Sequence, residues 1–556
     1  MKKSVLFGLT ATCGLVLSAC GGGSDTTTDS GAATGGDTGN LASEQIFRFV
    51  ESQEMPTADL SLATDVVSHN ALNSCYEGLY RVNADQELEP AGAAEMATLS
   101  EDGLTYTVKL NEKSVWTNGD PVTADDYVYG WQRTANPETA SEYAFFFENL
   151  ANGKEVVAGE KPVSELGIKA VSDYELEITL AKPTPYFEYL MAFPNFFPQH
   201  QATVEEFGDK YASDSDKAIY NGPFTLAEFD GPGIDTEWSY VKNPDYWDAE
   251  NVKLDAVEVT VVKESSTALN LFEDGQVDDI TLSGELAQQM ANDPRMVSEM
   301  EGSVFYLEYN QRAEDSPLKN VDLRKAVSYC IDRDSFVNNI ISNGSLAAYH
   351  LIPVDLVFDE SGKDFVDQVS TKADFDVDKA KEHWAKAKKD LGVETLEVEI
   401  LADDSERGKK IAEYLQGALE ENLEGMKVKV STVPFAVRLD RSNNGDFDIV
   451  MTGWGADYAD PSSFLDLFAT DGSYNRGKWT NAEYDALLEK MAVTDALDAD
   501  KRWEDMIEAS DIIMDEAAIA PVYQKAEAHM RAENVKGMVH HASGVKRDFK
   551  WIYIEE

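Results

Sequence analysis

The stretch between residues 396 and 430 constrains the fold most, because it alternates between strand and helix patterns. Leu396–Leu401 alternates apolar and acidic side chains, which is typical of a half-buried strand. Val428 and Val430 mark a second strand, and apolar residues recur between the two strands at helical spacing, at Ile411, Tyr414, Leu415, Ala418 and Leu419. This order and spacing predict a right-handed crossover between parallel strands, and therefore an α/β fold.

The length of the chain predicts more than one domain, because its 556 residues exceed the roughly 250–300 residues that one core supports.

Two further helices have clear end signals. Thr123 and Asp126 form the pattern of a capping box. Ser265 or Ser266 is expected to cap a second helix, which should end at Gly275.

Residues 1–19 have the pattern of a secretory signal, since Lys2 and Lys3 precede the apolar run Val5–Leu17 and small residues follow it. The run is too short for a permanent membrane span, which needs about 20 apolar residues. Cys20 resembles the cysteine of a bacterial lipobox, whose thiol receives a diacylglycerol. We therefore expect a lipid-anchored protein on the outer face of the cytoplasmic membrane. An ordinary signal peptide beside a coincidental cysteine is the alternative.

Residues 20–43 are expected to carry the lipidated cysteine and a flexible tether. Gly21–Asn40 contains only Gly, Ser, Thr, Asp, Ala and Asn, a composition that cannot bury a core. The globular part should begin near Glu44.

The charge balance excludes one class of partner. The chain has 102 acidic and 47 basic residues, a formal charge of −55. Nucleic acids and anionic lipids bind through clustered Lys and Arg, so we expect no nucleic-acid partner and no membrane contact beyond the lipid anchor. The acidity favours either capture of cations and basic peptides or simply a well-solvated surface.

The cysteines and histidines predict no metal site. Cys75 and Cys330 each lie in an apolar stripe at helical spacing and are expected to be buried thiols, although a disulfide between them stays open. Neither a Cys-x-x-Cys spacing nor a Cys/His cluster occurs. His540 and His541 are adjacent and would face opposite ways in a strand.

The sequence motifs of common enzymes are missing. The chain has no Gly-x-x-x-x-Gly-Lys-Ser/Thr loop, no His-Glu-x-x-His and no Gly-x-Ser-x-Gly. Its many carboxylates could supply an acid/base pair, but no spacing selects two of them. We therefore expect a protein that is not an enzyme and needs no cofactor, with a lipid-anchored extracellular hydrolase as a remote alternative.

The segment Gly453–Pro461 is the candidate site. The run Phe447–Met451 is expected to be a buried strand that ends at Gly453, and ligands of open α/β sheets bind beyond the carboxyl ends of strands. Two glycines flank Trp454 and allow close approach of another backbone, and Asp457 follows.

Together with this segment, seven others carry a resemblance to a known family. They occur in the family's order from about Ile46 to the C-terminus, at Trp116–Asp126, Tyr129–Arg133, Asn221–Phe224, Asn243–Trp247, Val321–Ala326, Pro461–Leu465 and Ala520–Tyr523. The chain resembles the oligopeptide-binding proteins of ABC importers, which form family 5 of the extracellular solute-binding proteins.

The resemblance implies a two-lobed periplasmic-binding-protein-like fold with two crossover strands, at Ser303–Asn310 and Ala520–Ala528, and an extra domain inserted in the first lobe. The implied limits are lobe I at 44–77, 209–302 and 530–556, inserted domain II at 78–208, and lobe III at 303–529. Ligand binding would close the lobes like a hinge.

The resemblance also implies roles for five residues. Asp457 would bind the ammonium group of a peptide, and the backbone of Gly453, Trp454 and Gly455 would pair with the peptide as an added strand. Val66 would approach the peptide from the first lobe. Asp457 could instead be a capping or surface carboxylate, and Trp454 a core aromatic residue.

The chain departs from the family at the ligand's carboxylate. Some members have an arginine three residues before the tryptophan, and this chain has Met451 there. Arg438 and Arg441 lie upstream but do not match the family pattern. Gly455 stands where some members have a disulfide-bonded cysteine.

The implied function is capture of extracellular oligopeptides, as nutrients or signals, and their delivery to an ABC permease that is driven by cytoplasmic ATPases. The protein is expected to be a monomer on the cell surface of a Gram-positive bacterium. Receptors for a nickel chelate, haem or an oligosaccharide on the same fold are the alternative within the binding class.

Overall fold

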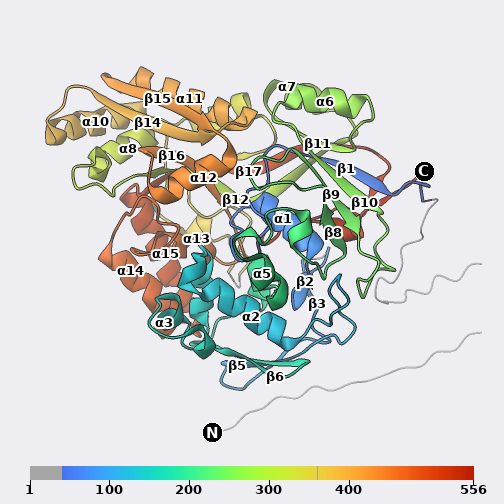
Figure 1. Ribbon diagram of the computed structural model, residues 1–556. Helices are drawn as coiled ribbons and strands as arrows, with labels where there is room; N and C mark the ends of the chain where they lie inside the picture. Colours follow the sequence, from blue (N-terminus) through green and yellow to red (C-terminus); the bar gives the residue numbers. More distant parts are fainter. Residues whose placement is uncertain (1–40, 85, 360) are drawn as a thin grey trace, which may run out of the picture. The chain divides into compact units, whose positions relative to one another are not determined.

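One large sheet organises the chain in the computed structural model, which describes residues 41–556 except 85 and 360 (Figure 1). The expected signal at 1–19, Cys20 and most of the tether lie outside the described residues. The sheet has 11 strands, ten of them in the order β15-β14-β16-β12-β17-β11-β1-β10-β9-β8, with β13 (Leu346–Ala347) beside β17.

Two long antiparallel strands lie in the middle of this sheet, β12 (Met296–Tyr309) and β17 (Ile519–Arg531). They contain the two expected crossover segments, apart from residue 310 just beyond β12. One side of the pair carries β16 (Ile449–Gly455), β14 (Leu396–Asp403) and β15 (Met426–Val433). The other side carries β11 (Asp279–Leu282), β1 (Ile46–Glu51), β10 (Ala256–Val261), β9 (Glu237–Lys242) and β8 (Phe224–Ala227). The central pair therefore joins two groups of strands.

The strand–helix–strand unit predicted from the sequence is confirmed. β14 and β15 are parallel over their whole length, from the pair Leu396–Met426 to the pair Asp403–Val433. Helix α11 (Glu406–Asn422) connects them and buries Ile411, Ala412, Leu415 and Leu419 against the sheet. Helices α8 (Val321–Tyr329) and α10 (Val377–Leu391) complete the same core.

A separate four-stranded sheet forms within the region expected to be domain II. Its order is β4 (Thr98–Leu99), β5 (Thr105–Lys109), β7 (Glu175–Thr179) and β6 (Ile168–Ser172). Helix α2 (Ala124–Ala135) packs near β6, and its capping box is confirmed, since the Thr123 backbone N–H donates to Asp126 Oδ2 at 2.7 Å. The domain limits given above remain predictions.

The N-cap expected for the helix near residue 265 was wrong. Helix α6 (Ser265–Glu273) takes Glu264 as its N-cap, and Ser265 is its first helical residue. The Ser265 N–H donates to Glu406 Oε2 at 2.9 Å, so a carboxylate from α11 serves the helix end in place of a local serine. The helix does end before Gly275, whose φ of +69° favours glycine.

The end of β16 also differs from the expectation. The strand was expected over Phe447–Met451 with its end at Gly453, but it continues to Gly455 because Gly453, Trp454 and Gly455 pair with β12. A Cβ atom on Gly453 would lie 2.8 Å from the ring of Phe305, so the absence of a side chain is what permits this pairing.

The two described cysteines are free and buried. Cys75 ends helix α1 (Val66–Cys75) and Cys330 follows α8, in different core clusters, so they form no disulfide.

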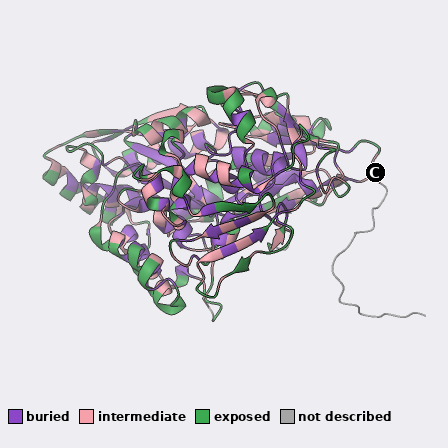
Figure 2. Cartoon of the chain, turned by 60° about the horizontal axis from the view of Figure 1, so that its bottom comes forward, coloured by how far each residue is buried: buried purple, intermediate pink, exposed green. Residues whose placement is uncertain are grey.

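Figure 2 shows how buried residues run through the centre of the fold while exposed residues gather on the outer helices. Within residues 41–556, apart from the two gaps, no helix is long and apolar enough to cross a membrane.

Candidate functional site

Strand β16 offers an open backbone edge at the predicted site. One edge of Gly453–Gly455 pairs with β12. On the other side β14 pairs only with Ile449 and Val450, so the edge from Met451 to Gly455 has no strand partner among the described residues. An unpaired strand edge presents N–H and C=O groups to which another extended chain can bind.

Asp457 lies just beyond this edge, with its carboxylate buried and only half satisfied. Oδ1 accepts a hydrogen bond of 3.2 Å from the Tyr143 hydroxyl, and the backbone N–H donates to Ser463 Oγ at 3.0 Å. Oδ2 has no hydrogen-bond partner within the part of the chain that the structure describes. The Asp457 side chain caps no helix end, because the carboxylate that binds the N–H of Ser462 belongs to Asp460.

Burial raises the pKa of Asp457 to about 8, although the Tyr143 hydrogen bond and the charge of Lys546 act in the opposite direction. A carboxyl group in this environment ionises readily only when a cation comes close. The oxygen that lacks a partner is therefore suited to an ammonium group.

Trp454 packs as a buried aromatic residue. Its ring stacks against Tyr143 with 6.0 Å between centroids and meets the ring of Tyr474 edge-on at 4.5 Å. The indole N–H has no acceptor among the described residues. The Trp454 ring is thus part of the hydrophobic core, whereas the Trp454 backbone lies on the open edge of β16.

Val66 lies at the start of helix α1 and is 39% exposed. It lines a small cavity of about 60 Å³ together with Glu301 of β12, Lys525 of β17 and Lys546. Lys546 also lies close to the β16 edge, since a Cβ atom on Gly455 would be 3.3 Å from Lys546 Nζ. The structure thus places Val66 at the start of a helix and not in an extended segment.

Sequence reasoning missed Tyr143 and Lys546. Tyr143 is 314 positions from Asp457 and lies in another part of the fold. Lys546 is buried and its ammonium group donates to the carbonyl of Ala542, which is a local contact. No spacing in the sequence signals either neighbour, because both contacts arise only when distant segments fold together.

Direct contacts join the two groups of strands across the cleft. Lys263, which follows β10, binds Asp404 at 2.9 Å and Glu54 at 2.8 Å. The Ser265–Glu406 hydrogen bond lies beside this ion pair. These contacts link the strand group of β1 and β10 to that of β14, which is the arrangement of a closed cleft.

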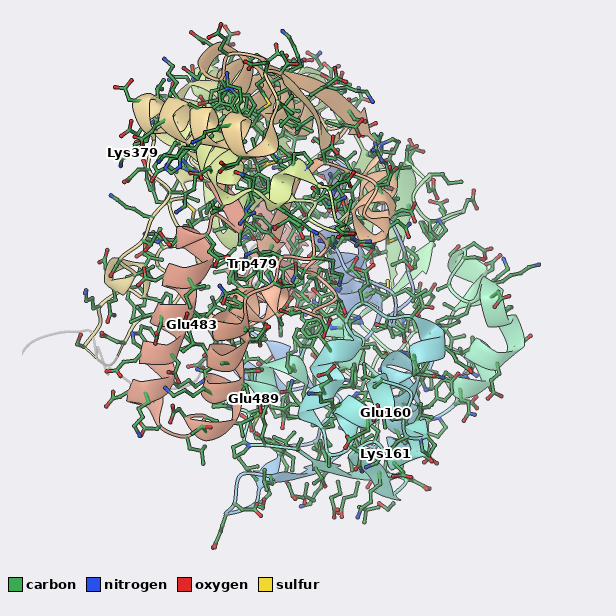
Figure 3. The ribbon with its side chains drawn as sticks, turned by 90° about the vertical axis from the view of Figure 1, so that its left-hand side faces the viewer. Glu160, Lys161, Lys379, Trp479, Glu483 and Glu489 are labelled. Atoms are coloured by element: carbon green, nitrogen blue, oxygen red, sulfur yellow. The ribbon has the colours of Figure 1, made fainter. Side chains whose placement is uncertain are left out.

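A wider cavity of about 740 Å³ lies between the segment Phe145–Tyr186 and the region of helices α13 (Ser462–Leu465), α14 and α15 (Ala499–Asp515). Tyr186 and Tyr458 form one wall, with stacked rings 4.0 Å apart. Glu489 at the end of α14 (Ala482–Glu489) also lines it (Figure 3). Asp457 does not line this cavity, although it directly precedes Tyr458.

Comparison with known proteins places the chain in a family. The model of the bacterial extracellular solute-binding proteins, family 5 Middle, matches residues 87–476. The chain belongs to this family. Among curated relatives, the dipeptide-binding protein of Lactococcus lactis subsp. cremoris is 33% identical over 100% of both chains. The dipeptide-binding protein DppE of Bacillus subtilis is 32% identical over 90% of this chain and 91% of its own.

Solved structures of the family confirm the two-lobed α/β fold. Listeria monocytogenes OppA bound to peptide has a TM-score of 0.89 and 41% identity, over 93% of this chain and 100% of its own. The pheromone receptor PrgZ has a TM-score of 0.88 and 34% identity, over 92% of this chain and 100% of its own.

Two structures of one family member differ in their likeness to this chain. The murein tripeptide binding protein MppA of Escherichia coli, 27% identical, has a TM-score of 0.83 in one structure. In its unliganded open form the TM-score falls to 0.60. The described residues are therefore less similar to the open form, which agrees with the contacts between the two groups of strands.

Proposed function

We propose that this protein binds oligopeptides outside the cell and delivers them to an ABC permease. The observation that carries the proposal is the open edge of β16, which leads to the carboxylate oxygen of Asp457 that has no partner. The names of the relatives, dipeptide-binding and oligopeptide-binding proteins, support the same ligand class.

In this proposal a peptide lies extended against Gly453, Trp454 and Gly455, and its ammonium group binds Asp457. Backbone pairing makes affinity largely independent of the peptide's sequence. The charge-assisted bond to the buried carboxylate contributes about 1.5–3 kcal/mol. Val66 closes over the ligand from the other side. The protein holds its ligand and hydrolyses nothing.

The anchor forms the second part of the proposal. Signal cleavage after residue 19 leaves Cys20 as a lipidated first residue, and two acyl chains suffice for stable membrane attachment. The tether then keeps a monomeric receptor beside its permease on a Gram-positive cell surface. Cys20→Ala should move the protein from the membrane fraction to the medium, whereas Cys13→Ala should leave it in the membrane fraction. Membrane retention of Cys20→Ala would contradict the anchor.

The domain limits are proposed on the same basis. The separate sheet of β4 to β7 supports an inserted domain at 78–208, and the position of β12 and β17 supports lobe I and lobe III on either side. Limited proteolysis of the peptide-free protein should cut preferentially near residues 78 and 208.

Native mass spectrometry of the purified protein tests the ligand class. Co-purified masses that differ by single amino-acid residues would support the peptide receptor. A single metal chelate, haem or sugar would support the alternative receptors, and turnover of a peptide or glycoside panel would support a hydrolase.

A further inference from the structure

We infer that the wider cavity is a second ligand site, which binds a free amino acid with an aromatic side chain through Lys182 and Asp466. The site lies apart from the end of β16, because Asp457 does not line the cavity. The inference stands on the cavity alone and goes beyond the proposed function, so either one can fail while the other holds.

Lys182 and Asp466 are opposite charges on the two walls of the cavity, and neither has a partner. Lys182 belongs to the segment Phe145–Tyr186, whereas Asp466 directly follows helix α13. Within the described residues, neither the Lys182 ammonium group nor the Asp466 carboxylate takes part in a hydrogen bond or an ion pair. A ligand that carries both a carboxylate and an ammonium group would satisfy both side chains.

The two groups lie close enough to affect each other, although they do not form an ion pair. Burial lowers the pKa of Lys182 and raises the pKa of Asp466 to about 7. Among the charges that oppose these two shifts, Asp466 has the largest effect on Lys182, and Lys182 has the largest effect on Asp466. The gap between them is therefore short, because the interaction of two charges weakens with distance. A short gap suits an amino acid, whose ammonium and carboxylate groups are bonded to the same carbon.

The other charges along the cavity are already paired or lie in solvent. Arg502 donates through both of its terminal nitrogens to Asp460, at 2.8 Å each. Both carboxylate oxygens of Asp485 accept hydrogen bonds from Thr470. The remaining charged residues of the wall are exposed, namely Glu148, Lys154, Asp471 and Glu489. Two charged groups of the wall are thus left with neither a protein partner nor full exposure to water.

The chain around Lys182 is held in place before any ligand arrives. Pro183 and Pro185 restrict the backbone on either side of Thr184. The Thr184 hydroxyl donates to the Lys182 carbonyl at 3.2 Å, and the Thr184 carbonyl accepts from the Phe187 N–H at 3.1 Å. A segment that is already ordered loses little conformational entropy when it binds a ligand.

Aromatic and aliphatic side chains make up much of the remaining wall. Tyr186 is half-buried and stacks on Tyr458, and Phe146 lies beside Tyr458 with 6.2 Å between ring centroids. The apolar residues on the other wall include Leu467, Leu488 and Met491. The cavity volume of about 740 Å³ is in the usual range of small-molecule sites. The cavity therefore has both the space and the apolar surface for an aromatic side chain.

Titration calorimetry at pH 7.5 tests the inference on protein that is saturated with a tetrapeptide, because the peptide then occupies the cleft. Phenylalanine should bind saturably. Phenethylamine and 3-phenylpropionate each lack one of its two charged groups and should bind at least about tenfold more weakly. If no tetrapeptide binds, the proposed function fails, and the same three titrations of the protein alone still test the cavity.

Variants of the two charged residues provide the second measurement. Lys182→Gln and Asp466→Asn should each weaken phenylalanine binding at least about tenfold. Lys154→Gln and Glu489→Gln are the matched controls, since both residues line the cavity but are exposed, and they should leave the affinity unchanged. Melting temperatures identify any variant that does not fold.

Two kinds of result would overturn the inference. The first is an absence of saturable phenylalanine binding to the unmodified protein, or equal affinity for the three probes, and neither comparison needs a variant to fold. The second is a phenylalanine affinity that survives in folded Lys182→Gln and Asp466→Asn, or that falls equally in the two control variants.

Discussion

The raised pKa of Asp457 predicts that peptide binding releases a proton. In the ligand-free closed arrangement that the structure describes, the buried carboxyl group is mostly protonated below pH 8, because burial raises its pKa to about 8. An ammonium group binds its ionised form, so the carboxyl proton must leave when the peptide arrives. Affinity should therefore increase as the pH rises toward 8.

The size of this effect follows from the same value. Each pH unit below the pKa costs about 1.4 kcal/mol of binding free energy, or a factor of ten in affinity. Between pH 6 and pH 7.5 the dissociation constant should therefore fall about fifteen- to twentyfold, because at pH 7.5 part of the carboxyl group is already ionised and part of the peptide amine has lost its proton. Near pH 8 the increase should level off, because the peptide's own amine loses its proton at about 7.7–8.0.

Titration calorimetry of one tetrapeptide across this range provides the assay. Repeating the titration at pH 6.5 in two buffers with different ionisation enthalpies should give close to one proton released per peptide. Asp457→Asn should bind at least tenfold more weakly at pH 7.5 and lose the pH slope. A flat profile in the unmodified protein, or an affinity that falls from pH 6 to pH 7.5, would refute the reasoning.

The same substitution should stabilise the peptide-free protein. The folded-state pKa of Asp457 lies above its unfolded value of 3.8, so the fold disfavours the ionised form. The resulting loss of stability is absent below pH 4 and grows by about 1.4 kcal/mol per unit up to pH 8. In urea unfolding, the free energy of unfolding of Asp457→Asn should exceed that of the unmodified protein by more at pH 7 than at pH 5. An equal gain in unfolding free energy at pH 7 and at pH 5 would contradict the raised pKa of Asp457.

Three further predictions concern the surroundings of Asp457. Tyr143→Phe removes the hydroxyl that donates to the Asp457 carboxylate and should weaken peptide binding severalfold in the same calorimetric assay, whereas unchanged affinity would exclude a positioning role. Gly453→Val drives a branched side chain toward the ring on β12 and should lower the melting temperature, and an unchanged value would contradict the close packing. Lys263→Gln breaks the ion pair with Asp404 and should raise the peptide dissociation rate in stopped-flow measurements, with less dependence on salt than the unmodified protein shows.

The local patterns of the fold could be predicted from the sequence, whereas features that depend on contacts between distant segments could not. Helical and strand periodicity located β14, α11 and β15, because each buries one face on a single core. The cap of α6 was missed because Glu406 from another segment replaces a local serine. The end of β16 was missed because the β12 residues that pair with it lie 148 to 152 positions away in sequence, from the pair Gly453–Phe305 to the pair Gly455–Ser303.

The candidate site, too, could be predicted from the sequence only in part. The Gly-Trp-Gly-x-Asp pattern and the resemblance directed attention to Asp457 and to the β16 backbone. They could not predict the burial that raises the Asp457 pKa, nor the neighbours Tyr143 and Lys546, which come from distant segments and act to lower this pKa.

The central claim is that a peptide enters this cleft and is held by its free amine. Its most direct test is calorimetry at pH 7.5 with one tetrapeptide in two forms, with a free and with an acetylated N-terminus. We predict that acetylation weakens binding by more than tenfold, because it removes the charge that Asp457 Oδ2 would bind. Equal affinity of the two forms would contradict the amine-binding role of Asp457, and absence of binding by both would contradict the peptide receptor itself.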